Sequence, residues 1–167
     1  IYSVRQRSGY ISSMCRTKIT SNKIGNYLVS IGIIPNKTGK EFLPKINYTN
    51  DLIRGIFDGD GSICKKKNNT YQVNITSGNK QLCLDLQNYF GFGTIEKGHG
   101  NCWGWVTRNR DEIIEFRNTI YHNATVFLKR KKDILDTVKP TSKYIAFNEE
   151  KTLKEWSQDI RCVVSYD

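Results

Sequence analysis

Two kinds of hydrophobic periodicity divide the chain into predicted helices and strands. Apolar residues spaced three or four apart predict helices over 21–31, 52–60, 80–89 and 111–121. Alternation of apolar and polar residues predicts strands over 10–17, 62–67, 70–76, 94–97 and 101–107. From residue 52 onward the predicted order is therefore helix, two strands, helix, two strands, helix, which is typical of an α+β fold.

The strand predicted over 70–76 has one apolar face and one polar face. Tyr71, Val73 and Ile75 point to one side, whereas the residues between them carry amides or hydroxyls. A polar outer face is ordinarily a solvated one. Amides and hydroxyls spaced two apart on a basic chain are also the groups that read base edges in a major groove. The pattern leaves both interpretations open.

The helix predicted over 52–60 ends in an alternation of glycine and aspartate. Gly55 and Gly59 lie on one face, where the absence of side chains permits close approach of a second helix. Glycine inside a helix costs about 1 kcal/mol relative to alanine, so two of them call for a reason. One interpretation is a glycine-rich turn with Asp58 and Asp60 in solvent. The other is a helix–helix interface that delivers a carboxylate to a site at its lower end.

A calcium-binding loop is excluded for this stretch. Asp58, Asp60 and Ser62 begin such a loop at the correct spacing. However, Ile63 stands where the loop requires glycine and Asn69 where it requires glutamate. The two aspartates therefore need another explanation.

The charge of the chain favours a polyanionic partner, nucleic acid first. Lys and Arg total 26 against 16 Asp and Glu in 167 residues, a net charge of +10, and phosphate neutralisation by such residues dominates nucleic-acid binding. The cysteines are odd in number and form no C-x-x-C pair, which predicts reduced thiols in an intracellular protein. No run is long or apolar enough for a membrane span or a signal peptide, so no membrane partner is expected.

The stretch Ile53–Gly61 resembles the signature motif of LAGLIDADG homing endonucleases. It matches that motif at its glycines, at its second apolar position and at both acids, with Arg54 in place of an alanine. The predicted element order also resembles the αββαββα fold of the family, a saddle of four antiparallel strands whose concave face lies on DNA. The resemblance therefore implies a LAGLIDADG domain over residues 49–139.

The resemblance also implies a metal-dependent active site. Asp60 is the expected metal ligand, with the Gly61 carbonyl beside it, and oxygen ligands at a phosphodiester suit Mg²⁺ or another divalent cation. Lys131, with Lys129 as the alternative, aligns with a family lysine that stabilises the developing charge. Ser77 falls where the family often has a glutamine that orders water.

Cutting both DNA strands requires two motif helices joined through their glycine faces. Gly55 and Gly59 are assigned to this interface, together with Asp58, which is expected to shape and hydrogen-bond the helix end. The chain is expected to form a homodimer or to pair with a first LAGLIDADG half that precedes Ile1. By itself it is expected to be inactive or to nick one strand.

The predicted DNA-binding residues come from the strands, the turns and the basic segments that follow them. Arg108 and Arg110 are expected to contact phosphates rather than bases. The full set is Cys64, Lys66, Thr70, Gln72, Asn74, Thr94, Glu96, Trp103, Trp105, Arg108, Arg110 and Lys129.

A weak internal repeat suggests that residues 1–48 come from an earlier copy of the same domain. Tyr10–Thr38 and Cys102–Lys132 share an order of strand, arginine, capped helix, apolar pair and basic pair. Residues 1–48 are therefore interpreted as the C-terminal part of a first, degenerate or truncated half, in which Lys37 is the counterpart of Lys131. An unrelated N-terminal extension is the alternative.

Residues 140–167 form a C-terminal tail. Thr152 and Glu155 make a capping-box pattern, and Leu153, Trp156 and Ile160 follow helical spacing. The tail is interpreted either as the start of an incomplete helix-turn-helix or as a simple amphipathic helix.

Together these features predict a site-specific double-stranded DNA homing endonuclease of a mobile intron or phage, which hydrolyses phosphodiesters with a divalent metal. The alternative is a catalytically inactive LAGLIDADG nucleic-acid-binding protein, either an RNA maturase or a DNA-binding regulator. Retention of both Asp58 and Asp60 favours the nuclease, because a binding protein has no need of Asp60 at a phosphate. The expected location is a bacterial or phage-infected cytoplasm, or an organelle matrix.

Overall fold

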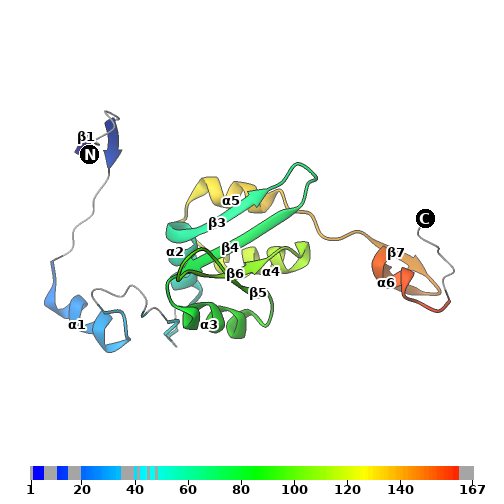
Figure 1. The fold of residues 1–167 in the computed structure, drawn as a ribbon, viewed down its shortest axis with the longest axis horizontal. Coiled ribbons are helices and arrows are strands. Elements are labelled where there is room, and N and C mark those ends of the chain that lie inside the picture. Colours follow the sequence, from blue (N-terminus) through cyan, green and yellow to red (C-terminus); the bar gives the residue numbers. More distant parts are fainter. Residues whose placement is uncertain are drawn as a thin grey trace. The chain divides into compact units, whose positions relative to one another are not determined.

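The chain folds into two compact units, residues 1–36 and residues 37–167, each of which is described by itself. The structure is a computed structural model (Figure 1), and it describes residues 2–5, 11–14, 20–34, 40, 42–44, 46–47 and 49–161. None of the helices in these ranges is both long enough and apolar enough to cross a membrane.

The first unit contains a β-hairpin and one helix. Strands β1 (Tyr2–Arg5) and β2 (Ile11–Met14) pair antiparallel. β1 was not predicted, and β2 lies within the strand predicted over 10–17, of which residues 10 and 15–17 lie outside the described part of the chain. Helix α1 (Asn22–Ser30) begins at Ser21, whose side chain accepts a hydrogen bond from the helix backbone. Gly32 follows with a φ of +88°, a left-handed conformation that suits glycine after a helix.

From the first motif helix to the helix that ends at Tyr121, the second unit has the predicted order of helices and strands, and one further helix follows. Its core elements are α2 (Thr49–Asp60), β3 (Gly61–Lys65), β4 (Tyr71–Ser77), α3 (Lys80–Phe90), β5 (Thr94–Lys97), β6 (Trp103–Thr107), α4 (Arg110–Tyr121) and α5 (Lys129–Asp136). The α+β fold with an antiparallel sheet is therefore confirmed, and the predicted boundaries differ from the observed ones by a few residues at most.

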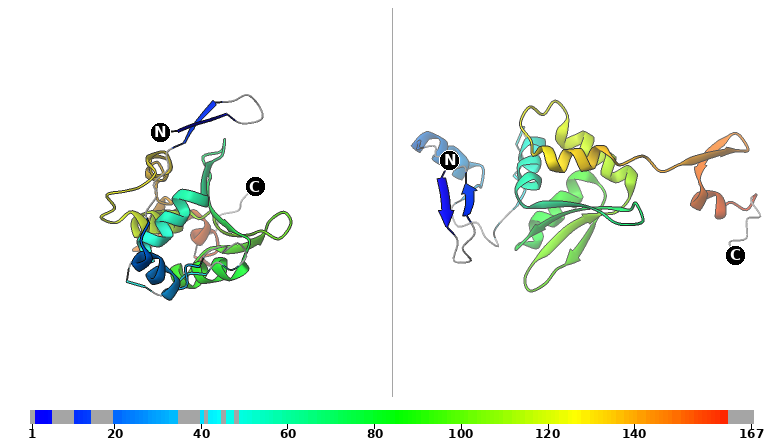
Figure 2. Two further views of the ribbon diagram at one scale, coloured as in Figure 1. Left: turned by 90° about the vertical axis from the view of Figure 1, so that its left-hand side faces the viewer. Right: turned by 90° about the horizontal axis from the view of Figure 1, so that it is seen from above.

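The four strands form one antiparallel sheet in the order β3-β4-β6-β5. Ile75 at its centre pairs with Gly61 on one side and with Trp105 on the other. Residues from α2, α3, α4 and α5 share one hydrophobic core with one face of the sheet, and the helices lie to that side (Figure 2). We call the opposite face, away from helices α2 to α5, the outer face.

An aromatic cluster holds the helices against the sheet. Trp105 of β6 is fully buried, and its ring lies 5.2 Å from Phe90 and 5.4 Å from Phe116, between ring centroids. Phe57 of α2 meets Phe116 edge to face at 5.1 Å. Burial of a large apolar side chain stabilises a fold by about 1.5–3 kcal/mol, so this cluster fixes α2, α3 and α4 against the strand that carries Trp105.

The C-terminal tail forms a second β-hairpin and a short helix. Strands β7 (Lys143–Ala146) and β8 (Glu149–Thr152) pair antiparallel and lead into α6 (Leu153–Ser157). The predicted capping box of Thr152 and Glu155 is confirmed, but the hairpin was not predicted.

The apolar stripe predicted for the tail is wrong, because only Trp156 of its three residues is buried. Leu153 is exposed, and the side chain of Ile160 is 99% exposed. The helix-turn-helix interpretation stays a prediction, since residues 162–167 lie outside the described part of the chain.

Candidate functional site

Helix α2 presents a bare glycine face with a free carboxylate at its end. Gly55 and Gly59 are exposed, and a Cβ atom on either would meet nothing within 4 Å. Asp60 is the last residue of the helix and is exposed. Within the described residues it has no hydrogen-bond or ion-pair partner. The end of α2 therefore offers an acidic oxygen pair that the fold itself does not use.

Asp58, in contrast, is fully engaged in holding the fold. Its Oδ1 accepts a hydrogen bond from the Tyr121 hydroxyl at 2.8 Å, and its Oδ2 accepts one from the Leu128 backbone N–H at 2.9 Å. Burial raises the pKa of Tyr121 above its ordinary value, and the bond to Asp58 raises it further. Asp58 thus has the hydrogen-bonding position expected for it, tying the end of α2 to α4 and to the start of α5.

Lys131 caps the C-terminal end of α2 from within the core. Its side chain is only 3% exposed, and its Nζ donates to the carbonyl oxygens of Phe57 (2.5 Å), Asp58 (3.0 Å) and Gly61 (2.5 Å). The last carbonyls of a helix lack partners within it, and a cation there also complements the helix dipole. Desolvation lowers the pKa of Lys131 below its ordinary value, and the nearby Arg130 lowers it further.

These contacts give Lys131 a structural role as a helix cap. An ammonium group has three donors, and three backbone carbonyls, that of Gly61 among them, accept from it. The roles predicted for Lys131 at the phosphate and for the Gly61 carbonyl at a metal stay predictions. The alternative residue, Lys129, is exposed and pairs with Asp133 at 2.7 Å. Lys37 lies outside the described residues.

Two further residues of the motif have structural roles. A Cβ on Gly61 would lie 2.7 Å from the carbonyl oxygen of Phe57, so only glycine fits where the helix turns into β3. Arg54 donates to the carbonyl oxygens of Ile120 at 2.9 Å and Val126 at 3.1 Å. The arginine that departs from the family motif therefore fastens α2 to the end of α4.

Ser77 lies at the same end of the sheet as the foot of α2 but is buried. It follows shortly after Ile75, the partner of Gly61 in the sheet, and is 8% exposed. Its hydroxyl accepts a hydrogen bond from the Asn79 backbone N–H at 2.9 Å. Ser77 thus shapes the turn into α3, and its predicted role in ordering water stays a prediction.

The outer face of the sheet brings together side chains from all four strands. The pairing register places Cys64 opposite Gln72 and Asn74 opposite Val106, with Thr94 beyond Val106. Its residues are Ser62, Cys64, Gln72, Asn74, Thr76, Thr94, Glu96, Gly104 and Val106. The polar parity of β3, β4 and β5 was therefore predicted correctly.

Trp103 and Trp105 were assigned to the wrong face of β6. Trp105 is fully buried in the aromatic cluster, and its indole N–H donates to the Phe92 carbonyl at 3.0 Å. Trp103 is half-buried and lies under the Lys80 ammonium, 4.7 Å from its ring centroid. The small residue between them, Gly104, is the one on the outer face, because the core gains more from burying two indoles than from burying glycine.

A charged network crosses three strands at the edge of the outer face. Arg108 donates to both carboxylate oxygens of Glu96, at 2.5 and 2.9 Å, and its Nε donates to the Gln72 amide oxygen at 3.1 Å. The hydrogen bond from Arg108 lowers the pKa of Glu96, and the same bond raises the pKa of Arg108. Arg108 is thus already paired in the absence of any ligand.

Asn74 lies at the centre of the outer face against bare backbone. A Cβ on Gly104 would lie 2.8 Å from the Asn74 Oδ1. This oxygen is buried and has no hydrogen-bond partner within the described residues. The amide is therefore pressed flat onto β6, where a larger neighbour would displace it.

The remaining DNA-binding predictions lie at the tip of the β3–β4 hairpin. Lys66 and Thr70 are exposed there, and Thr70 donates its hydroxyl hydrogen to the Asn68 side chain at 2.6 Å. Arg110 donates to the Asn69 carbonyl at 3.1 Å and so supports the turn. Lys65 and Lys67 are also exposed, which makes the tip basic.

The predicted DNA-binding set omitted four residues of the outer face, and the support beneath the motif was not predicted. Ser62 and Thr76 belong to the outer face by simple alternation from Cys64 and Asn74, so that signal was present. Gly104 and Val106 were omitted because β6 was assigned the opposite face. No sequence signal identifies the bonds of Arg54 and Lys131, because their partners are backbone carbonyls distant in the chain.

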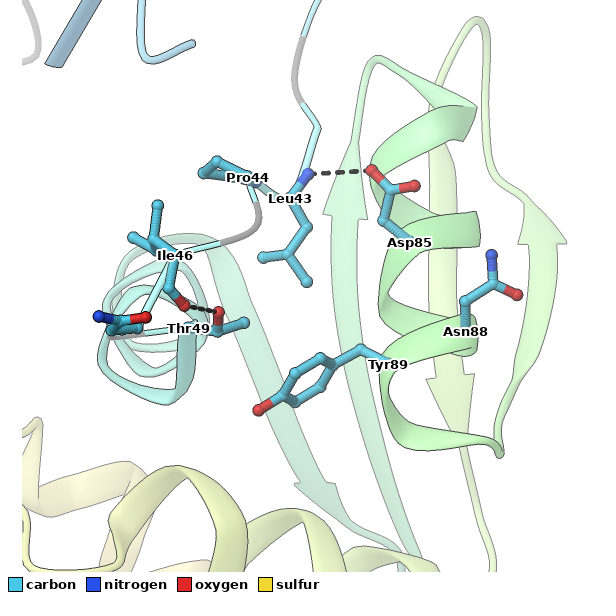
Figure 3. Close-up of a pocket in the computed structure, with 8 residues that line it drawn as sticks. Leu43, Pro44, Ile46, Thr49, Asp85, Asn88 and Tyr89 are labelled. Atoms are coloured by element: carbon cyan, nitrogen blue, oxygen red, sulfur yellow. Dashed lines mark hydrogen bonds between the residues drawn. The ribbon is translucent and has the colours of Figure 1, made fainter. Parts of the chain in front are cut away.

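A cavity of about 580 Å³ lies at the other end of α2, away from Asp60 (Figure 3). Leu43 and Pro44 line it on one side, and Asp85 and Tyr89 of α3 on the other. The Asp85 carboxylate accepts a hydrogen bond from the Leu43 backbone N–H at 2.9 Å. This contact attaches the segment before α2 to α3, and the cavity holds none of the predicted site residues.

The chain matches one family model and is similar to several solved structures. Residues 47–121 match the family described as LAGLIDADG-like domain. The homing endonuclease I-TnaI is 18% identical, with a TM-score of 0.41, over 55% of this chain and 69% of that one.

Two DNA complexes are comparably similar. The archaeal intron-encoded homing endonuclease I-Vdi141I complexed with DNA is 19% identical, with a TM-score of 0.42, over 53% of this chain and 64% of that one. The LAGLIDADG meganuclease I-AabMI bound to uncleaved DNA is 18% identical, with a TM-score of 0.46, over 55% of this chain and 35% of that one. No curated protein sequence matches the chain.

Proposed function

Residues 47–121 match the family described as LAGLIDADG-like domain, and we propose that the chain belongs to this family and is a site-specific endonuclease of double-stranded DNA that uses a divalent cation. The observation that carries this proposal is Asp60, a free and exposed carboxylate at the end of the open glycine face of α2. A protein that only binds nucleic acid would gain nothing from an exposed carboxylate there, because phosphates repel it.

The outer face of the sheet is the proposed DNA-binding surface. It carries hydroxyl and amide groups from β3, β4 and β5, and such groups donate to and accept from base edges in a major groove. The basic hairpin tip, with Lys65, Lys66 and Lys67, is suited to contacts with the phosphate backbone. The net charge of +10 supports the same partner.

Asp60 is the residue that would hold the divalent cation. Mg²⁺ is commonly bound through one or two carboxylates and keeps several waters, which fits one free carboxylate on this chain. Among the described residues, no group of three or more His, Cys, Asp or Glu side chains could hold a metal ion by itself. A bound Mg²⁺ supplies charge stabilisation at the phosphate and lowers the pKa of a bound water.

The residues around Asp60 hold it in position. Lys131 fixes the carbonyls on both sides of the helix end, at Asp58 and Gly61. Asp58 fastens the same turn to Tyr121 and Leu128. These bonds let the fold present the Asp60 carboxylate on a rigid helix end, which a metal or phosphate site requires.

A second motif helix would complete the site. Gly55 and Gly59 leave the α2 surface open, so the backbone of another helix could approach closely there. We propose that this helix comes from a second copy of the chain or from an N-terminal half, of which residues 1–48 are a part. Two such helices would bring two aspartates to adjacent phosphates, one on each DNA strand.

The test is cleavage of a supercoiled plasmid that carries the uninterrupted form of the locus holding this gene. The full-length protein with Mg²⁺ is expected to nick or linearise this plasmid. A plasmid that lacks the locus is expected to stay uncut. Asp60→Asn is expected to abolish cleavage while retaining DNA binding. Glu115→Gln, which removes another exposed carboxylate, on α4, is the matched control and is expected to cut normally.

Two results would contradict the nuclease. One is binding of the locus without cleavage by the full-length protein, which would favour the nucleic-acid-binding alternative. The other is cleavage that survives Asp60→Asn, which would remove the proposed metal ligand from the mechanism. Omission of Mg²⁺ or addition of EDTA is expected to stop cleavage by the unmodified protein.

A further inference from the structure

We propose that Glu96 and Gln72, both held by Arg108, read a G·C base pair through its major-groove edge. The inference rests on the proposed function in one respect, namely that the outer face of the sheet lies on DNA. It goes further by assigning a base pair to named side chains and by giving Arg108 a positioning role in place of the phosphate contact predicted for it.

The network fixes which hydrogen-bonding groups remain available. Arginine has only donors, so the Gln72 atom that faces the Arg108 Nε must be the amide oxygen, as the 3.1 Å contact has it. The orientation of this amide is therefore determined, and both hydrogens of its nitrogen are left for another partner.

Glu96 keeps acceptor capacity after it has paired with Arg108. A carboxylate offers about four lone-pair positions. The two N–H groups of the Arg108 fork use two of them, at 2.5 and 2.9 Å, and the Thr94 hydroxyl lies 3.5 Å from Oε1. The side chain of Glu96 is 43% exposed, so its remaining lone pair is open to a ligand.

The ion pair between Glu96 and Arg108 also allows a glutamate to lie on a DNA-binding face without repelling the phosphates. A lone carboxylate would be repelled by the phosphates, whereas the Glu96–Arg108 pair has no net charge. The bidentate geometry makes this pair stronger than a single contact. Glu96 can therefore approach a base edge without adding a negative charge to the surface.

The available donor and acceptor match one base pair. Glutamate accepts from the N4 amino group of cytosine, and a side-chain amide nitrogen donates to N7 or O6 of guanine. A G·C pair presents both edges in the major groove. The fork of Arg108, which would otherwise be the usual reader of guanine, is already occupied by Glu96.

The experiment selects bound sequences from duplexes with a randomised segment of about two helical turns, with EDTA present so that nothing is cut. The full-length protein is compared with Glu96→Gln, Arg108→Gln and the double variant. Glu115→Gln adds the same charge as Glu96→Gln at a site on α4 and is the electrostatic control.

The unmodified protein is expected to enrich a G·C pair at one position. Glu96→Gln is expected to reduce the preference for cytosine there by about ten-fold, while the other positions keep theirs. The double variant has the unmodified net charge, so it is expected to keep the salt dependence of binding but to lose the G·C preference. Glu115→Gln is expected to keep the full sequence preference.

Three outcomes would overturn the inference. In the first, Glu96→Gln keeps the G·C preference and binds more tightly than Glu115→Gln, which would make Arg108 the reader. In the second, Glu96→Gln loses its preferences at every position. In the third, the unmodified protein enriches specific sequences, but at no position does it show a G·C preference that Glu96→Gln weakens. Failure of the unmodified protein to enrich any sequence would instead contradict the proposed site-specific function itself.

Discussion

The Nζ atom of Lys131 lies 2.5 Å from the carbonyl oxygen of Gly61, the residue that follows the free carboxylate of Asp60. A lysine of helix α5 thus completes the hydrogen bonding of a helix that ends 71 residues earlier in the chain, at Asp60.

Lys131→Met is expected to destabilise the fold. The change removes the donor of three carbonyls, and each buried acceptor left without a partner costs about 1–3 kcal/mol. The free energy of unfolding, measured by urea denaturation, is expected to fall by roughly 3 kcal/mol or more. Lys129→Met, at an exposed position on the same helix, is expected to change it by less than about 1 kcal/mol. Equal effects of the two variants would refute the capping role of Lys131.

The two aspartates of the motif are expected to separate stability from activity. Asp58→Asn keeps one acceptor for two donors, so the free energy of unfolding is expected to fall by about 1–3 kcal/mol. Asp60→Asn removes a carboxylate that has no hydrogen-bond or ion-pair partner among the described residues, and it is expected to change stability by less than about 0.5 kcal/mol. Urea denaturation monitored by circular dichroism distinguishes them. A larger loss for Asp60→Asn than for Asp58→Asn would contradict the assignment.

Glycine substitutions on α2 are expected to act in opposite directions. Gly59→Ala places a methyl group in open space and is expected to stabilise the separate chain by about 0.5–1 kcal/mol, since alanine favours helix. Gly61→Ala drives a methyl group into Phe57 and is expected to cost about 1–3 kcal/mol. If the glycine face is a helix interface, Gly59→Ala also lowers cleavage or self-association, as measured by sedimentation. A stabilised variant with unchanged cleavage would argue against that interface.

Trp105→Ala is expected to act on the fold rather than on base recognition. Removal of a fully buried indole costs about 3–5 kcal/mol, which thermal or urea unfolding would report. Under conditions in which this variant still folds, its sequence preference in DNA binding is expected to match that of the unmodified protein. A selective change of base preference with little loss of stability would restore Trp105 to the DNA-facing set.

The tail is expected to loosen in acid. Glu149 and Asp159 both bind Arg161 and Lys151, and hydrogen bonds from Arg161 and then Lys151 lower the pKa of Glu149 from 4.5 to about 2. The same two residues lower the pKa of Asp159.

The stability from these ion pairs is present above the ordinary carboxylate pKa and is lost as the pH falls from about 4.5 to about 2. Solvent exchange of the Trp156 indole N–H, which donates to Tyr144 at 2.7 Å, is expected to accelerate over this range. In the double variant Glu149→Gln, Asp159→Asn the acceleration is expected to be absent. An unaltered pH dependence in that variant would contradict the prediction.

Several elements could be predicted from local patterns because their determinants lie within a few residues. The capping box at Thr152 and the N-cap at Ser21 are contacts between residues three apart. The alternation over β4 predicted its two faces, since neighbouring side chains of a strand point to opposite sides. The tail hairpin was missed because its turn uses Phe147 and Asn148, both with positive φ, and phenylalanine is not a turn signal.

The two faces of β6 show where local patterns stop being sufficient. Alternation states that Trp103 and Trp105 share a face and that Gly104 does not, but it does not state which face the helices cover. That choice depends on Phe90 and Phe116, which come from two helices and meet Trp105 only in the folded chain.

The sequence by itself determined the order of helices and strands from α2 to α4, the glycine face of α2 and its acidic end, because these are periodic or contiguous features. Only the tertiary structure decided that both carboxylate oxygens of Asp58 accept hydrogen bonds within the fold, whereas Asp60 has no such bond among the described residues. It also decided that Lys131 caps the end of α2. The reason is physical: backbone carbonyls and hydroxyls from distant segments become hydrogen-bond partners only when the core brings them together, and those partners decide which charges remain available for chemistry.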